Sequence, residues 1–112
     1  MSRGAKELLE IIRQLYPCQK IELEYNIADK GALFLDIYLP QLKIGFEYDG
    51  ELHFHYNEHF HGTRENFIRA QKRDFEKDER CEVLGITLVR VAYNEEMTKA
   101  SVLNKLERVL NG

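Results

Sequence analysis

Residues 33–50 read LFLDIYLPQLKIGFEYDG and decide the fold. Two apolar runs, at 33–39 and 43–49, are separated by a turn at Pro40-Gln41. A run at 20–27 alternates apolar with charged side chains, which is the pattern of a half-buried strand. Because short connections favour antiparallel pairing, the sequence predicts a three-stranded meander of these segments.

The rest of the chain is expected to supply helices and one more strand. Apolar residues recur at helical spacing before Pro17, which stops the run. Thr63 and Gly85 are typical N-cap and stop residues of a long helix. The elements expected are helices at 3–15, 63–84 and 94–110, a strand at 86–93 and an irregular loop at 51–63. The order αβββαβα predicts a single domain over residues 1–112, in the α/β class, with helices on the faces of one mixed sheet.

The composition excludes several classes of protein. The chain has 112 residues, of which 44% are hydrophobic and 31% charged, a mixture typical of globular domains. No apolar run approaches the roughly 18 residues of a membrane helix, so a cytoplasmic protein without membrane partners is expected. The two cysteines form no CxxC pair, which argues against a disulfide framework. The net charge of −3 supplies no overall basic field, although a metal ion or a local patch can attract nucleic acid.

Three carboxylates lie where apolar side chains are expected. Asp36 interrupts one strand, and Glu47 and Asp49 are two residues apart in the next. Because side chains alternate faces along a strand, Glu47 and Asp49 project to the same side, and Asp36 can lie opposite them. Such a cluster of hard oxygen ligands suits Mg²⁺ or Mn²⁺. The alternatives are that Asp49 belongs to an Asp-Gly turn and that Glu47 faces solvent.

The long helix also carries charge on the face that should pack on the sheet. At about 100° per residue, Asp74 lies within the stripe that contains Phe67 and Cys81, and Lys77 lies at its edge. Buried charges need partners. One interpretation is a structural ion pair that involves Asp74, Lys77 or Asp78. The other is that Asp74 and Lys77 reach the carboxylate cluster, where Lys77 would orient water or stabilise charge on a phosphate.

At these residues the chain resembles the PD-(D/E)xK restriction-endonuclease-like superfamily. It is most similar to the small branch related to very-short-patch repair and phage homing endonucleases. The resemblance extends over most of residues 2–93 and rests on motifs in the right order: LDIYLP at 35–40, IGFEYDGELH at 44–53, RDFEK at 73–77 and GITLVRV at 85–91. It implies an αβββαβ core and metal-dependent hydrolysis of DNA.

The resemblance also implies roles for individual residues. Asp36 would be the first catalytic metal ligand and Glu47 the second acid. Asp49 stands where the superfamily pattern has a lysine, a departure that this branch shares, and would also belong to the metal site. His53 would act near the scissile phosphate as a general base or as a charge stabiliser. The helix-borne partners would be Asp74 and Lys77.

The histidines and the basic residues of the long helix are further candidates. His55 and His59 would share one face of a helix and suggest zinc, but the segment has no cysteine ligand, which makes structural zinc the less favoured interpretation. Four basic side chains are expected to contact DNA phosphates, with a solvated helix face as the alternative. They are Arg64, Arg69, Lys72 and Arg73.

The sequence therefore predicts a Mg²⁺- or Mn²⁺-dependent DNA endonuclease, which the resemblance suggests is phage-encoded. Two other classes remain open. An inactive nucleic-acid-binding module of the same fold agrees with the acidic pI and with Ala5, which stands where relatives of this branch often carry a glutamate. A structural or interaction protein would use the carboxylates in internal ion pairs. Since so small a domain has little surface for recognition, a homodimer or an accessory protein is also expected.

Overall fold

The computed structural model describes residues 1–112, apart from the side chain of Phe60. The elements in chain order are α1 (Arg3–Leu15), β1 (Glu22–Asn26), β2 (Phe34–Leu39), β3 (Ile44–Asp49), the 3₁₀ helix η1 (Glu51–His53), α2 (Glu58–His61), α3 (Arg64–Leu84), β4 (Thr87–Ala92) and α4 (Lys99–Asn111). One sheet has the order β1-β2-β3-β4, with antiparallel pairing up to β3 and parallel pairing of β3 with β4. The expected α/β class with a mixed sheet and a C-terminal helix is confirmed. None of the described helices is long and apolar enough to cross a membrane.

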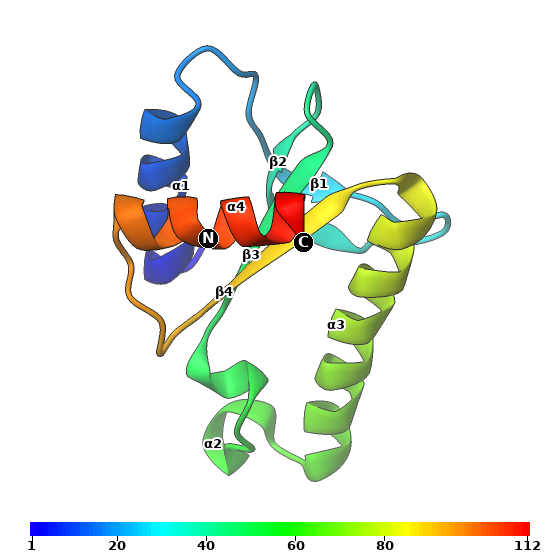
Figure 1. Ribbon diagram of the computed structural model, residues 1–112. Helices are drawn as coiled ribbons and strands as arrows, with labels where there is room; N and C mark the ends of the chain where they lie inside the picture. The colour runs from blue at the N-terminus through cyan, green and yellow to red at the C-terminus, as the bar shows by residue number, and fades with distance from the viewer.

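Helices pack on both faces of the sheet (Figure 1). On one face, Leu8 of α1 and Leu106 of α4 are buried in a cluster with Phe46 of β3. On the other face, α3 buries Cys81 against a second cluster that includes Tyr38. In Figure 1, α3 is the long helix along one side of the molecule, and α2 lies beside its N-terminal end. The ends of β3 and β4 therefore lie between α1 and α4 on one side and α3 on the other.

The predicted ends of the long helix are confirmed. The Thr63 hydroxyl accepts a hydrogen bond from the Asn66 N–H at 3.1 Å, which caps the first turn of α3. Gly85 follows the last turn with a φ of 72°, a left-handed conformation that glycine adopts without strain. A glycine is also required in α1, because a Cβ on Gly4 would lie 2.2 Å from the ring of Tyr48. The absence of a side chain at Gly4 lets α1 approach β3, the strand that carries Glu47.

Two sequence predictions of local structure were wrong in detail. Residues 51–63 are not an irregular loop throughout, because they contain η1 and α2. The short α2 is held locally by the Asn57 N–H, which donates to His61 Nδ1 at 3.0 Å. The last helix begins at Lys99 rather than at residue 94, because the Thr98 hydroxyl caps it by accepting the Ser101 N–H at 3.2 Å.

Candidate active site

Asp36 and Glu47 meet between β2 and β3. The paired positions of these strands end at Ile37 and Phe46, so the two acids occupy the next pair of positions. The Asp36 N–H donates to Glu47 Oε2 at 2.9 Å, and the Tyr48 N–H donates to Asp36 Oδ2 at 2.9 Å. At this pair of positions the N–H groups of Asp36 and Tyr48 therefore donate to carboxylate oxygens, rather than to the backbone carbonyl groups that usually accept between strands. The prediction that Asp36 lies opposite Glu47 is confirmed.

Lys77 of α3 contacts this carboxylate pair. Its Nζ donates to Glu47 Oε1 at 2.5 Å, and the two side chains are only 15% and 4% exposed. Burial and the neighbouring charge of Asp36 raise the pKa of Glu47 to about 7, although Lys77 acts in the opposite direction. Of the two interpretations of Lys77, the contact with the carboxylates is the one that the structure bears out.

Asp49 points toward Arg90 of β4. The two residues are neighbours across the parallel pair of strands, and Arg90 Nη1 donates to Asp49 Oδ1 at 2.9 Å. Burial raises the pKa of Asp49 even though the charges of Arg90 and His53 oppose the shift. Asp49 is thus a strand residue in a buried ion pair, rather than an exposed turn residue.

His53 and Asp74 form a hydrogen-bonded pair beside Asp49. His53 Nδ1 and Asp74 Oδ2 are 2.8 Å apart, and Asp49 Oδ1 lies 3.7 Å from the same nitrogen. The hydrogen bond to Asp74 raises the pKa of His53 against the effect of burial. Burial acts to raise the pKa of Asp74, but the hydrogen bond and charge of His53 outweigh it, so that this pKa is lowered. The carboxylate therefore orients the imidazole and leaves Nε2 as its second polar atom.

Arg90 is the residue of this region that sequence reasoning missed. Besides Asp49, it donates through Nε to Asp78 at 3.0 Å and through Nη2 to the backbone oxygen of Asp74 at 2.9 Å. It thereby ties β4 to two successive turns of α3. A signal was present, since Arg90 interrupts an apolar strand in the same way as Asp36 does. Burial acts to lower the pKa of Arg90, and the charges of Asp49 and Asp78 reverse the shift.

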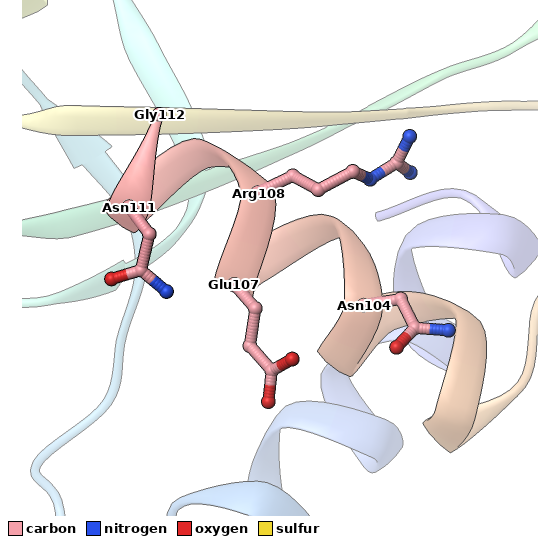
Figure 2. A pocket seen from close by; sticks show the side chains of 5 residues that line it. All are labelled: Asn104, Glu107, Arg108, Asn111 and Gly112. Atoms are coloured by element: carbon pink, nitrogen blue, oxygen red, sulfur yellow. The ribbon is translucent and has the colours of Figure 1, made fainter.

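Two cavities adjoin the imidazole of His53. One, of about 310 Å³, is lined by Asp49, His53, Phe54, Gln71, Asp74, Phe75, Asp78 and Arg90. The other, of about 390 Å³, is lined by Ser2, Tyr48, Gly50, Glu51, Leu52, His53, His61 and Ala70. A separate hollow at the C-terminal end of α4 is lined by Asn104, Glu107, Arg108, Asn111 and Gly112, so none of the candidate residues lies in it (Figure 2).

The predicted metal ligands that the structure brings together are two carboxylates, Asp36 and Glu47. Among the described residues, no group of three or more histidine, cysteine or acidic side chains is arranged to hold a metal ion. Mg²⁺ does not need such a group, because one or two carboxylates suffice when water and phosphate complete its shell. Asp36 and Glu47 provide two carboxylates at opposite positions of neighbouring strands, and the charge of Asp36 adds to burial in raising the pKa of Glu47. Asp49 is engaged by Arg90 instead.

The remaining predicted residues lie on α3 and in α1. The basic side chains expected to contact DNA are all exposed: Arg64, Arg69, Lys72 and Arg73. Arg64 lies 4.6 Å above the ring of Tyr56, and Arg69 donates to Asn66. Ala5 is 2% exposed and packs into the interior next to the sheet.

Comparisons with known proteins found viral relatives. Over 75 residues the chain is 37% identical to uncharacterized protein 307L of Invertebrate iridescent virus 6, covering 67% of this chain and 38% of the relative. Over 101 residues it is 32% identical to uncharacterized protein 033L of Invertebrate iridescent virus 3, covering 87% and 52%. Over 63 residues it is 41% identical to uncharacterized protein 094L of Frog virus 3, covering 55% and 41%.

The chain thus spans about half or less of the length of these curated relatives. No family model matches the chain. No solved structure matches it either.

Proposed function

We propose that this protein is a Mg²⁺- or Mn²⁺-dependent endonuclease that hydrolyses phosphodiester bonds of DNA. The observation that carries the proposal is the contact of Asp36 with Glu47, two acids on neighbouring strands with Lys77 against them. Two carboxylates that share a partly buried position repel each other unless a cation or a proton neutralises them. In this proposal Asp36 and Glu47 hold the metal ion. The ion would supply charge neutralisation at the phosphate and an activated water.

Side chains around the pair have complementary roles. Lys77 positions Glu47, and its ammonium group would balance charge on a bound phosphate. His53 would accept or donate a proton through Nε2, while Asp74 holds the ring through Nδ1. Asp49 lies 3.7 Å from that ring and is fixed by Arg90. These roles require a phosphate bound between the carboxylate pair and His53, whereas the two cavities beside the imidazole are lined by His53 without Asp36, Glu47 or Lys77.

DNA is proposed as the substrate on chemical grounds. The exposed basic residues Arg64, Arg69 and Arg73 lie on the same helix as Lys77, where a phosphate backbone can reach them. The viral relatives support a viral origin of the protein. A phage source and a cytoplasmic location are proposed in addition.

A second candidate, an internal ion-pair network without catalysis, is favoured by one specific observation. Several of the candidate acids have a cationic partner within the chain: Glu47 pairs with Lys77, Asp49 with Arg90, and Asp74 with His53. Such a network needs no metal ion. It predicts that divalent cations change neither stability nor any activity of the protein.

Plasmid cleavage distinguishes the two candidates. The purified protein, with Asp36→Asn and Glu47→Gln, is incubated with supercoiled DNA in Mg²⁺, in Mn²⁺ and in a chelator. We expect nicking by the wild type with metal and its loss in both variants. Glu95→Gln is the matched control, because it removes a Lys–Glu pair outside this region, and it should leave nicking unchanged. Equal nicking by wild type, Asp36→Asn and Glu47→Gln would indicate a contaminating nuclease and contradict the proposal.

A further inference from the structure

An exposed apolar stripe runs along α3. At about 100° per residue, Phe75 and Val83 lie within about 60° of Ile68 around the helix axis. Lys77 and Cys81, which face the sheet, lie about 180° and 220° from Ile68, so the stripe points away from the sheet. The side chains of the stripe are 60% (Ile68), 62% (Phe75) and 74% (Val83) exposed. Large apolar side chains in a row on one helix face are typical of an interaction surface.

The charges of α3 divide between its two halves. Residues 64–73 contain four basic and one acidic side chain, whereas residues 74–84 contain five acidic and two basic side chains. Two copies of this helix in antiparallel arrangement would place each basic half against the acidic half of the other. A surface that complements itself in this way suits a twofold homodimer.

We propose that the stripe is the interface of a homodimer in which two α3 helices pack antiparallel about an axis near Phe75. In this register Phe75 meets the partner's Phe75, and Ile68 meets the partner's Val83. Lys72 then meets the partner's Glu79, and both lie within about 40° of Ile68 on the same helix face. Both side chains are exposed, and within the described part of the chain neither forms an ion pair.

The homodimer does not depend on nuclease activity, but it bears on the candidate site. Phe75 also lines the cavity that contains His53 and Arg90, so the cavities of the two copies would lie beside the dimer axis. Lys72 contacts the partner in this arrangement rather than DNA. Arg69 and Arg73 lie about 100° and 140° from Ile68, outside the stripe, and stay accessible to phosphates.

The test is the mass of the protein in solution, measured by analytical ultracentrifugation. Because a single pair of helices is a small interface, concentrations up to about 500 μM are needed. The wild type is expected to form dimers, and Phe75→Glu is expected to be monomeric. Leu110→Glu, at an exposed apolar position of α4, is the matched control and should remain dimeric. Circular dichroism of each variant establishes that it is folded.

A charge exchange tests the register. Lys72→Glu and Glu79→Lys each place like charges across the interface, so each alone should be monomeric. An equimolar mixture restores both opposite-charge pairs and should form a heterodimer. The proposal is overturned by a wild type that stays monomeric, by a dimer that survives Phe75→Glu, or by a mixture that fails to associate. Dimers lost in Leu110→Glu and kept in Phe75→Glu would place the interface on α4 instead.

Discussion

Asp36 and Glu47 each place a carboxylate oxygen on the backbone of the neighbouring strand: Glu47 Oε2 accepts the N–H of Asp36, and Asp36 Oδ2 accepts the N–H of Tyr48. Backbone groups of the sheet therefore hold one oxygen of each acid, and Lys77 of α3 holds the other oxygen of Glu47. The positions of the two acids are set by the fold, so the metal site proposed above would be preorganised. The proposed metal site needs ionised Glu47, and this is in conflict with stability, because burial and the charge of Asp36 raise the pKa of Glu47 to about 7.

This conflict predicts that Glu47→Gln stabilises the protein at neutral and alkaline pH. A raised pKa means that the folded state binds the proton more tightly than the unfolded state, so ionisation of Glu47 destabilises the fold. This destabilisation by ionised Glu47 is absent below about pH 4.5 and complete above about pH 7. In a chelator at about pH 8, we expect Glu47→Gln to raise the free energy of unfolding by about 1–3 kcal/mol. Urea unfolding at several pH values measures it.

The control variant, Glu95→Gln, is expected to change the free energy of unfolding in the opposite direction. Glu95 is bonded to Lys105 and to the Ala92 N–H, and these contacts outweigh burial and lower the pKa of Glu95. Its ionised form therefore stabilises the fold, and Glu95→Gln should lose stability at about pH 8. A Glu47→Gln variant that is less stable than the wild type at this pH would show that the ion pair with Lys77 outweighs burial.

Asp74→Asn is predicted to lower the pKa of His53. The hydrogen bond and the charge of Asp74 raise that pKa, and burial alone would lower it. Because the pKa is raised in the folded state, protonated His53 stabilises the fold fully below about pH 6.5, and this contribution is lost as the pH rises through the raised value. NMR titration of the imidazole signals in a chelator measures the pKa of His53 in the wild type and in Asp74→Asn. Asp78→Asn should leave the pKa in place, since Asp78 pairs with Arg90.

Most of the fold followed from the sequence because its signals are local. Strand periodicity, the caps at Thr63 and Gly85 and the short turn at Pro40 each depend on a few adjacent residues. The turn also sets the register of the two strands, which is why the approach of Asp36 to Glu47 was predictable. The η1 and α2 helices were missed because residues 51–63 have no clear period, and α2 depends on hydrogen bonds such as that of Asn57 with His61.

The partners of the acids could not be predicted as reliably. Arg90 is 41 residues from Asp49 in the chain, and their contact depends on the parallel pairing of β3 with β4. Helical spacing placed Asp74 and Lys77 on the correct face, but it did not distinguish a contact between them from separate contacts with the sheet. Lys77 reaches Glu47 and Asp74 reaches His53 because α3 crosses both residues.

Arg90→Ala is predicted to destabilise the protein more than the loss of any surface ion pair. The substitution leaves Asp49, whose side chain is 10% exposed, without its cation. It also removes the hydrogen bond that Arg90 donates to the backbone oxygen of Asp74. We expect a loss of about 2–4 kcal/mol in the free energy of unfolding. Arg3→Ala breaks the exposed pair with Glu7 and should change it by less than about 1 kcal/mol. Urea unfolding measures both variants. Similar losses in the free energy of unfolding would show that the contacts of Arg90 contribute no more than an exposed ion pair.

Divalent cations are predicted to raise the melting temperature through Asp36 and Glu47. If these carboxylates bind Mg²⁺, the folded state gains about 1.4 kcal/mol when free metal is tenfold above its dissociation constant. Differential scanning fluorimetry with increasing Mg²⁺ and Mn²⁺ should show this shift in the wild type and its absence in Asp36→Asn and Glu47→Gln. Lys77→Ala removes the cation that competes for Glu47, so its melting temperature should be lower without metal and rise further with metal. Identical shifts in wild type and Asp36→Asn would mean that the metal binds elsewhere, and the carboxylate pair would then be a structural feature alone.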